Sequence, residues 1–398
     1  MRWFTCTPVN FLGNEIFFSR DSGLMSLGLK AVGLEGRAIS LAPAREGDWP
    51  ALIRATLSEL ESADWWRTQQ LDGVVFYSWG VARYQKIADA IVSANVRLVH
   101  VCDTHGIFSP LSDWKAHVTA AWSHQWYDSQ LKKFLRTLAK LPYSHTLGIL
   151  RQDLPIARMI DTGDFFLAAT PAAAARFRRF IKILRGAQAA DKVRMLPLPV
   201  HSHFCYAPSV TKEELVVAVG RWDHPQKRAG LLMHTIRLTA QARPATRFVI
   251  FGKVPPPLAV WHAGLPESIR SRVNLAGVVT SQQLAQVYQR ARVMLVSAAY
   301  EGCHNASAEA VCCGCSVVAV DTPFMAALAW HASKKSGLLA THASPRALAH
   351  SLCDELAAWE NGERHPELFG PEWADVFHPD KVALRILELF GIPAPLST

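Results

Sequence analysis

Short apolar runs alternate along the chain with segments whose apolar residues recur at helical spacing. The clearest runs are five or six residues long and rich in valine, phenylalanine and leucine. Runs that are apolar throughout predict strands buried on both faces, and helical segments between them predict parallel sheets covered by helices on both sides. The pattern therefore predicts an α/β fold with two doubly wound domains. The runs lie at 74–78, 97–101, 165–170, 215–220, 247–252, 293–297 and 316–320, with weaker ones at 193–196 and 273–277.

A proline-rich stretch without clear periodicity, LPLPVHSHFCYAPS at 196–209, predicts a boundary between the two domains. The segment 374–391 predicts a helix with one apolar face, and we expect the end of the chain, 376–398, to pack back on the first domain. Ligands of doubly wound sheets bind beyond the carboxyl ends of the strands, so we expect the chemistry in a cleft between the domains. The expected parts are an amino-terminal domain over 1–200, a linker over 201–211 and a carboxyl-terminal domain over 212–375.

Composition is that of a folded globular protein: of 398 residues, 50% are hydrophobic and 19% are charged. No apolar run approaches the roughly 20 residues that cross a bilayer, and the first residues lack the apolar stretch of a signal peptide. We therefore expect a cytoplasmic protein.

The eight cysteines lack the paired spacings of zinc sites, and HSHFC at 201–205 lacks a convincing further ligand. We expect no metal site and expect the cysteines to pack as small apolar residues.

Positive charge is concentrated in one region of the chain. Residues 114–194 carry 14 lysines and arginines against 5 acidic residues, a net charge of +9. Such a region indicates a surface for an anionic partner, such as phosphate, nucleic acid or a membrane. Within it, 114–141 predicts an amphipathic helix, which fits equally a solvated charged face and attachment to an anionic membrane. The basic stripe is Lys132, Arg136 and Lys140, and the apolar stripe is Leu131, Leu135 and Leu138.

Two glutamates frame a loop and a helix in the stretch EGCHNASAEAVCCG at 301–314. We expect a helix from Asn305, as its N-cap, to Cys313, with Gly314 in the left-handed position beyond its end. The backbone N–H groups at such a helix start attract phosphate or sugar oxygens. Glu301 at the mouth of the loop and Glu309 in the first turn can accept hydrogen bonds from sugar hydroxyls. The spacing alone fits equally a solvated Glu301 and a Glu309 that complements the helix dipole.

The stretch NLAGVVTSQQLAQVYQRARVMLVSAAYEGCHNASAEAVCCGCSVVAVDTP at 274–323 resembles the donor-binding half of retaining glycosyltransferases of family 4, which have the GT-B fold. VAVGRWDHPQKRAG at 217–230 resembles the phosphate-binding strand and loop of that family, with Arg221 followed by Lys227. SGLLA at 336–340 and the helix after it resemble the last strand and helix of the same domain. The resemblance is strong over 212–355 and fainter in the amino-terminal half.

The resemblance implies a donor site for a nucleotide-sugar, which is a UDP-, GDP- or ADP-sugar. Arg221 and Lys227 would neutralise the diphosphate without a metal, Glu309 would hold the ribose and Glu301 the sugar hydroxyls. Front-face attack, in which the leaving phosphate helps to take the acceptor proton, would retain configuration without a protein nucleophile or a cofactor. Further donor contacts are expected at Gly302, Cys303, His304 and Asn305, and beside the base at Gly252, Val278 and Val279.

The acceptor side departs from the family pattern. The glycine-rich loop after the first strand is reduced to TPVNFLGNE at 7–15, so the implied acceptor contacts are Asn10, Gly13 and Asn14. His105, in VHVCDTHGIF at 100–108, lies where the family places a histidine in the catalytic cleft, and Asp103 would orient it or contact the ligand. A single histidine in such a place can equally be structural.

The leading expectation is a retaining, metal-independent glycosyltransferase that moves a hexosyl or related group to a saccharide, a lipid-linked or another hydroxyl acceptor. With a lipid-linked acceptor, contact with the inner face of an anionic membrane through 114–141 would be expected. One alternative is another GT-B enzyme of nucleotide-sugars, an epimerase or a hydrolase. The other is a basic nucleic-acid-binding protein, although the chain shows no nucleic-acid-binding motif that we recognise.

Overall fold

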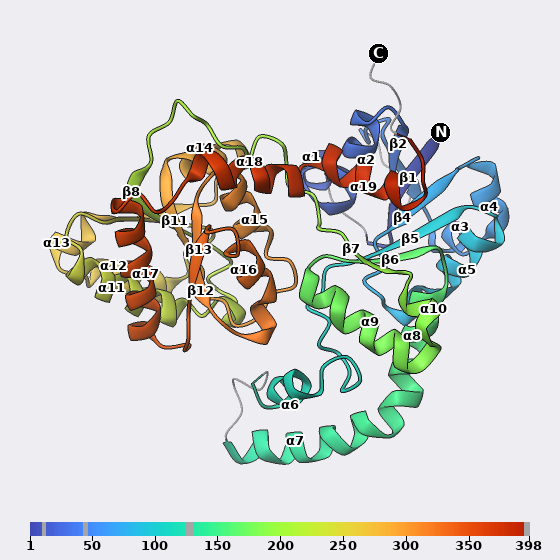
Figure 1. Ribbon diagram of the computed structural model, residues 1–398, viewed down its shortest axis with the longest axis horizontal. Helices are drawn as coiled ribbons and strands as arrows, with labels where there is room; N and C mark the ends of the chain where they lie inside the picture. The colour runs from blue at the N-terminus through green and yellow to red at the C-terminus, as the bar shows by residue number, and fades with distance from the viewer. Residues whose placement is uncertain (10–12, 43–46, 124–129, 394–398) are drawn as a thin grey trace. The chain divides into compact units, whose positions relative to one another are not determined.

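The computed structural model describes residues 1–9, 13–42, 47–123 and 130–393 of the chain (Figure 1). The contacts divide the chain into two compact units. The first consists of Met1–Pro199 together with Pro379–Thr398, and the second of Val200–His378. None of the described helices is long and apolar enough to cross a membrane.

The first unit contains a parallel sheet of seven strands in the order β3-β2-β1-β4-β5-β6-β7. The chain therefore builds the sheet outward from β1 in one direction and then from β4 in the other, which makes the border of β1 and β4 the switch point of the topology. The strands are β1 (Arg2–Thr7), β2 (Glu35–Leu41), β3 (Leu52–Ala55), β4 (Gly73–Phe76), β5 (Arg97–Cys102), β6 (Phe165–Ala168) and β7 (Val193–Met195).

Helices join the strands of the first unit, and several begin at side-chain caps. Thr170, for example, accepts a hydrogen bond from the backbone of Ala173 and is followed by proline at the first helical position, which suits a helix start. The helices are α1 (Asn14–Phe18), α2 (Asp21–Ala31), α3 (Leu57–Leu60), α4 (Ala63–Thr68), α5 (Gln85–Ser93), α6 (Trp114–Ser123), α7 (Gln130–His145), α8 (Leu154–Asp161), α9 (Pro171–Arg185), α10 (Ala187–Ala190) and α19 (Pro379–Leu389), with a 3-10 turn at Ala82–Tyr84 and a π-helix at Ile149–Asp153.

The second unit contains a parallel sheet of six strands in the order β10-β9-β8-β11-β12-β13. Its switch point is the border of β8 and β11. The strands are β8 (Glu213–Val219), β9 (Arg247–Phe251), β10 (Val273–Gly277), β11 (Ala291–Leu295), β12 (Ser316–Val320) and β13 (Gly337–Ala340). The helices are α11 (Ala229–Ala242), α12 (Pro256–Ala263), α13 (Glu267–Arg270), α14 (Ser281–Arg290), α15 (Asn305–Cys312), α16 (Ala326–His331), α17 (Pro345–Glu360) and α18 (Pro366–Phe377), with 3-10 turns at Pro225–Lys227 and Pro323–Met325.

Alternate residues of the strands in the second unit pack against different helices. Val216 and Val318 belong to the apolar cluster with the residues of α11 and α17. Val217 and Val317 belong to the cluster with the residues of α14 and α15. Both faces of the sheet are therefore covered, which explains why these strands are apolar throughout their length.

The predicted doubly wound α/β fold is confirmed, and each of the nine apolar runs corresponds to a strand. Two strands were not predicted. β2 begins with exposed and charged residues, and β3 has only four residues, so neither gives a continuous apolar run. The cysteine prediction is confirmed for Cys6, Cys102, Cys312, Cys313 and Cys315, which are buried, whereas the other three are partly exposed.

The prediction of one helix over 374–391 is wrong. α18 ends at Phe377, His378 is extended with φ −64° and ψ 144°, and Pro379 begins α19. Proline disfavours helical backbone at the residue before it and cannot donate a helical hydrogen bond, so the helix stops and restarts here. α19 packs on α2 in the first unit. The segment expected to be a linker, 201–211, belongs to the second unit, where Phe204 is buried in the core.

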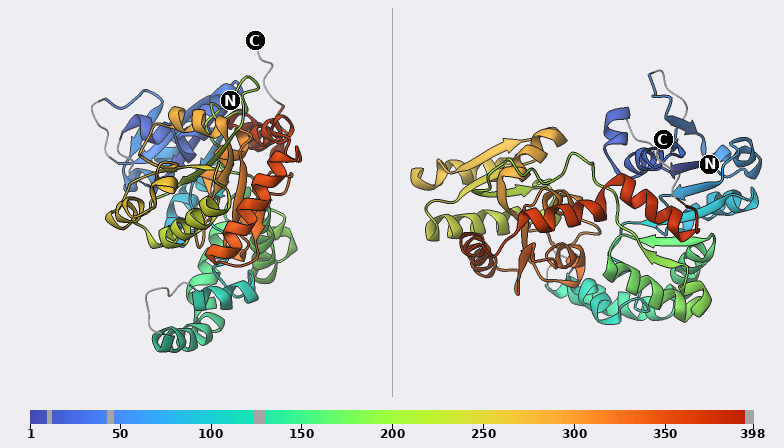
Figure 2. Two further views of the ribbon diagram at one scale, coloured as in Figure 1. Left: turned by 90° about the vertical axis from the view of Figure 1, so that its left-hand side faces the viewer. Right: turned by 45° about the horizontal axis from the view of Figure 1, so that its top comes forward.

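The helices of the basic region lie beyond α8 and α9, away from the sheet of the first unit (Figure 2). α6 and α7 pack against each other. The apolar stripe of α7 faces solvent, since Leu131, Leu135 and Leu138 are 67%, 53% and 60% exposed. Lys132 and Lys140 are also exposed, while the side chain of Arg136 lies outside the described residues.

Gly28 sets the distance between α2 and α19. A Cβ atom at this position would lie 2.2 Å from the backbone oxygen of Pro379, at the first residue of α19. We predict that Gly28→Ala lowers the free energy of unfolding of the first unit by about 1–3 kcal/mol, because the added methyl group overlaps backbone atoms that cannot rotate away. Thermal unfolding, with limited proteolysis at 379–393, measures the effect.

Gly230→Ala in α11 is the matched control. Gly230 is also helical, but a Cβ atom there would meet no atom within 4 Å. Alanine at this position should leave the stability unchanged or raise it by up to about 1 kcal/mol. Equal stability of the two variants would contradict the close packing of α2 and α19.

Candidate functional site

Two loops meet at the switch point of the second unit. Residues 220–228 follow β8, and residues 296–304 follow β11, and the two strands are neighbours in the sheet. Loops that leave the carboxyl ends of neighbouring parallel strands at a switch point form the usual ligand site of an open α/β sheet. The sequence-predicted residues Arg221, Lys227 and Glu301 lie on these loops.

Hydrogen bonds tie the two loops together. The backbone N–H of Ala299 donates to the carbonyl of Gln226 at 2.8 Å. The side-chain amide of Gln226 donates to the carbonyl of Tyr300 at 2.6 Å, and the hydroxyl of Ser297 donates to the carbonyl of Lys227 at 2.7 Å. The backbone that carries Lys227 therefore has a fixed position relative to the loop that carries Glu301.

Arg228 adds a partly buried cation to this connection. Its backbone is left-handed, with φ 49°, and its guanidinium donates to the carbonyls of Ser297 at 2.7 Å and Ala298 at 2.5 Å. Burial lowers the pKa of Arg228 to about 10, so the side chain is still charged at neutral pH. Sequence reasoning did not single out Arg228, because a third cation near Arg221 and Lys227 carries no signal of its own.

Lys227 and Glu301 contact each other directly. Lys227 Nζ lies 2.5 Å from Glu301 Oε1, and the two side chains are 14% and 17% exposed. The backbone N–H of Glu301 also donates to the carbonyl of Phe324 at 3.0 Å, which anchors it to the loop after β12. The fold thus brings together a cation and a carboxylate that are 74 residues apart in sequence. The two side chains were predicted to bind different parts of one ligand.

Arg221 differs from Lys227. Its side chain is exposed, and within the described part of the chain its guanidinium forms no hydrogen bond or ion pair. Only its backbone is engaged, since its carbonyl accepts a hydrogen bond from His224 at 2.9 Å. Arg221 is therefore available to an anionic ligand without the loss of an internal partner.

Helix α15 begins differently from the prediction. Its N-cap is His304, whose backbone is left-handed with φ 49° and whose Nδ1 accepts from the backbone N–H of Ser307 at 3.2 Å, so the prediction of Asn305 as N-cap is wrong. An imidazole nitrogen takes the place of the usual hydroxyl or carboxylate oxygen. Because the helix begins at Asn305, Glu309 is its fifth residue, and the prediction that it lies in the first turn is wrong too. Gly314 has φ 68°, as predicted for the residue beyond the helix end.

A buried hydrogen-bond chain supports this helix start. Ser307 Oγ lies 2.6 Å from His331 Nδ1 and 2.9 Å from the carbonyl oxygen of His304. The hydroxyl has one proton, and a carbonyl can only accept, so His331 Nδ1–H donates to Ser307, which donates to His304. Burial lowers the pKa of His331 to about 3, which keeps the imidazole neutral. His331 was not singled out from sequence, because its partner lies 24 residues away.

The remaining donor-side residues lie on this side of the sheet or on α15. Gly252, at the end of β9, has φ 113°, and a Cβ atom there would lie 1.9 Å from the oxygen of Gly220, so only glycine fits. After β10, Val278 is 80% exposed while Val279 packs against the core. Glu309 is partly buried, and its charge helps burial to raise the pKa of Tyr288 in α14. Gly302, Cys303 and Asn305 are all partly buried.

On the acceptor side, Asn10 lies outside the described residues. Gly13 has φ 89° and precedes α1. The side chain of Asn14 donates to the carbonyl of Gly47 at 2.7 Å and accepts from the backbone N–H of Trp49 at 3.1 Å, so it connects two loops. Asp103 and His105 follow β5, and His105 Nδ1 accepts from the backbone N–H of Ile107 at 3.0 Å.

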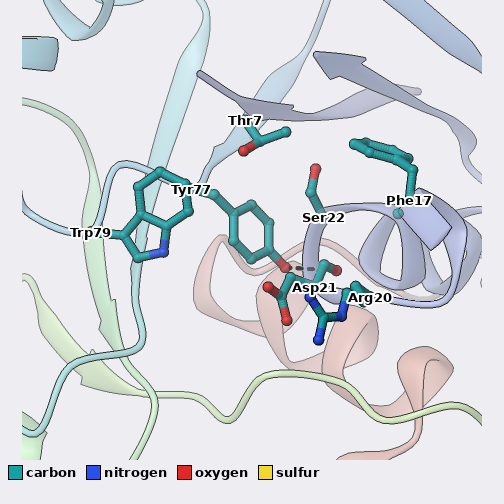
Figure 3. Close-up of a pocket in the computed structure, with 8 residues that line it drawn as sticks. Thr7, Phe17, Arg20, Asp21, Ser22, Tyr77 and Trp79 are labelled. Carbon is teal, nitrogen blue, oxygen red and sulfur yellow. Dashed lines mark hydrogen bonds between the residues drawn. The ribbon is translucent and has the colours of Figure 1, made fainter. Parts of the chain in front are cut away.

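The switch point of the first unit is lined by residues that sequence reasoning missed. Figure 3 shows Thr7 from the end of β1, Tyr77 and Trp79 from the loop after β4, and Ser22 from the start of α2 around a small pocket. The Tyr77 hydroxyl donates to the carbonyl of Asp21 at 3.1 Å. Finding these residues required knowledge that β1 and β4 are neighbours, which the sequence does not contain.

Among the residues that the structure describes, no three His, Cys, Asp or Glu side chains are arranged to hold a metal ion. His201 and His203 stack with ring centroids 4.0 Å apart, without a third such group.

Comparison with known proteins finds a family model and solved structures that are similar to this chain. Residues 213–357 match the family model described as glycosyl transferases group 1, while no curated protein matches the chain. Sucrose-phosphate synthase from Thermosynechococcus elongatus is 14% identical with a TM-score of 0.59, and the match covers 98% of each chain. HepE from Anabaena in complex with UDP is 15% identical with a TM-score of 0.60, covering 98% of this chain and 100% of that one.

The apo form of the lipopolysaccharide outer core galactosyltransferase WaaB is 14% identical, with a TM-score of 0.56 and coverage of 98% of this chain and 99% of that one. At such identities the solved structures show the fold alone. The expected GT-B fold is therefore confirmed, and the second unit carries a glycosyltransferase domain that matches the group 1 family model.

Proposed function

We propose that the protein is a retaining glycosyltransferase of family 4 that transfers a hexosyl or related group from a nucleotide-sugar to a hydroxyl acceptor, without a metal. The observation that carries the proposal is the Lys227–Glu301 pair on two fastened loops at the switch point of the second unit. Both residues lie within 213–357, the segment that matches the glycosyltransferase model. A cation for the diphosphate and a carboxylate for the sugar are thereby neighbours, as a nucleotide-sugar requires.

A uridine diphosphate sugar is the first donor to test. Structures of HepE, which shares the fold, contain UDP, UDP and glucose, or UDP-glucose. The exposed Val278 after β10 and the glycine at the end of β9 provide an apolar surface and a close backbone approach for a flat base. GDP- and ADP-sugars are the comparison ligands.

The two cations have different tasks in this proposal. Arg221 contacts the diphosphate directly, because it gives up no internal partner. Lys227 turns from Glu301 to the phosphates, and Glu301 is then released to accept hydrogen bonds from the sugar hydroxyls. As the glycosidic bond breaks, negative charge grows on the leaving diphosphate, and fixed cations stabilise that charge. The leaving phosphate helps to take the acceptor proton on the same face, so the configuration is retained.

The exposed stripe of α7 supports a peripheral contact with an anionic membrane. Leu131, Leu135 and Leu138 face solvent instead of a protein core, and Lys132 and Lys140 lie on the same helix. Apolar side chains can enter the interface of a bilayer while lysines bind anionic lipid headgroups. The segment 114–141 is thus proposed as the membrane-facing part of the protein.

Loss of either cation should reduce turnover strongly. We predict that Arg221→Ala and Lys227→Ala each lower kcat with the identified donor about 10²–10³-fold, because a fixed charge that stabilises the leaving group is lost. The matched control is Lys334→Ala, since Lys334 is exposed and precedes β13, at the amino ends of the strands and away from the site. Initial rates of transfer from UDP-glucose measure the effect. Near-normal turnover of Lys227→Ala would show that the phosphate site lies elsewhere.

The two glutamates should have separable effects on binding. Glu309→Gln should weaken the binding of free UDP about tenfold or more, because a charge-assisted hydrogen bond to the ribose is lost. Glu301→Gln should leave UDP affinity unchanged or raise it, because Lys227 is released from its carboxylate, while transfer is impaired. Calorimetry with UDP beside a transfer assay distinguishes the two. An equal loss of UDP affinity in both variants would contradict the assignment.

Transfer should not need a divalent cation. We predict that the rate of transfer is unchanged after the protein has been dialysed against EDTA, because Arg221 and Lys227 supply the charge that a metal would otherwise provide. The assay follows glucose incorporation with EDTA and with added Mg²⁺ or Mn²⁺. Loss of activity in EDTA that Mg²⁺ restores would refute this mechanism. Release of free glucose, or of an epimerised nucleotide-sugar, without an acceptor would favour the hydrolase or epimerase instead.

A further inference from the structure

A cavity of about 500 Å³ lies in the first unit, at the carboxyl ends of β4 and β5. This volume and a mostly apolar lining are typical of sites for small organic molecules. Its apolar wall comes from a loop after each strand and from α8 and α9. The wall residues are Trp79, Ile107, Phe108, Ile156 and Phe177.

The backbone at Trp79 is held in an unfavourable conformation. Trp79 has φ 51° and the following Gly80 has φ 67°, and the N–H of Trp79 donates to the carbonyl of Val101 at 3.0 Å. A bulky residue in the left-handed region is unfavourable, and such strain is concentrated at functional sites. With this backbone conformation, Trp79 lines both the cavity and the switch-point pocket of Figure 3.

The loop after β5 is fixed to α9. Arg176 donates to the carbonyl of His105 at 2.8 Å and pairs with Asp113 at 3.1 Å. Because His105 Nδ1 accepts a backbone hydrogen bond, the proton of the neutral imidazole is on Nε2. His105 lines the cavity, and this hydrogen bond orients its ring.

Another part of the lining comes from a π-helix, Ile149–Asp153, an element that is rare and often found at functional sites. Buried Asp153 accepts a 2.5 Å hydrogen bond from Ser109, which fastens this turn to the loop after β5. Arg151 and Gln152 from the π-helix line the cavity. Leu150 and Leu154, which flank them, are 63% and 40% exposed.

Among the described residues that line the cavity, the charged side chains are two arginines, apart from any charge on His105. Arg83 donates to the hydroxyl of Tyr84 at 2.5 Å. In the described part of the chain, neither Arg83 nor Arg151 pairs with a carboxylate. An apolar chamber with two arginines free of internal anions is complementary to an apolar molecule that carries a negative charge.

We propose that this cavity is the acceptor subsite and that it binds an amphiphilic acceptor, in which an apolar portion is attached to a phosphate or another anionic group. The apolar portion packs on Trp79, Phe108 and Ile156, and Arg83 and Arg151 bind the anion. The acceptor role rests on the glycosyl transfer proposed above, whereas the binding of such amphiphiles does not.

Two kinds of molecule combine an apolar portion with an anionic group. One is a lipid phosphate with an aliphatic chain, and the other is a soluble aromatic anion. Octyl phosphate and 1-naphthyl phosphate represent them. Calorimetric titration of the full chain with each probe, below its micellar concentration, is expected to give one site. Octyl glucoside, which lacks the charge, and inorganic phosphate, which lacks the apolar part, should bind at least about tenfold more weakly. The tighter of the two phosphate probes identifies the source.

Arg83→Gln and Arg151→Gln locate the binding site. Each should weaken the preferred probe about tenfold, the loss of one charge-assisted hydrogen bond. Both side chains are exposed, so the variants should fold. Arg179→Gln is the matched control, since Arg179 is an exposed residue of α9 outside the cavity lining. Equal affinity in all three variants, or equal binding of octyl glucoside, would overturn the proposal.

Titration of the same protein with UDP separates this proposal from the proposed function. If UDP binds and neither phosphate probe does, the acceptor subsite is wrong and the donor site stands. If a phosphate probe binds as expected and no nucleotide-sugar does, the amphiphile site stands, while its role as an acceptor subsite fails with the proposed function.

Discussion

The desolvated guanidinium of Arg228 determines the geometry of the donor side. It donates hydrogen bonds to the carbonyl oxygens of Ser297 and Ala298, in the loop after β11. Burial of a cation costs free energy unless its donors are satisfied, and the depressed pKa of Arg228 reflects that cost. The two carbonyl oxygens accept hydrogen bonds from Nε and from one terminal nitrogen of this guanidinium. Lys227, one residue earlier on the same loop, is thereby positioned to pair with Glu301.

Another partly buried cation of the second unit, Lys212, also donates to carbonyls, where two helices end. Lys212 Nζ donates to the carbonyls of Tyr288, Ala291 and Cys313, where α14 and α15 end, and burial lowers its pKa to about 8. Its three donors match three acceptors, and the negative ends of two helix dipoles favour the charge. Arg228 and Lys212 thus connect segments of the second unit by donating hydrogen bonds to backbone carbonyls. In the proposed mechanism, the pair that a ligand separates is Lys227 and Glu301.

Sequence reasoning succeeded where a local pattern decides the structure. A strand that is buried on both faces must be apolar throughout, which is why SVVAV at 316–320 coincides with β12. Gly314 was predictable because a helix end needs a left-handed residue. The N-cap of α15 was not predictable from a local pattern. His304 can act as the cap because its backbone is left-handed and because Ser307, to which it is hydrogen-bonded, also contacts His331. The contact of Lys227 with Glu301 and the π-helix beside the cavity depend on packing between distant segments.

The two units have corresponding strand orders but differ in the residues at their switch points. In the second unit the loops after β8 and β11 carry arginine, lysine and glutamate, which suit a ligand with charges and hydroxyls. In the first unit the loop after β4 carries Tyr77 and Trp79, and the neighbouring cavity is apolar with two arginines. A shared topology fixes where each ligand binds, and the side chains fix its chemistry. The charged switch point suits the proposed nucleotide-sugar donor, and the aromatic side chains of the first unit suit the apolar part of the proposed amphiphilic acceptor.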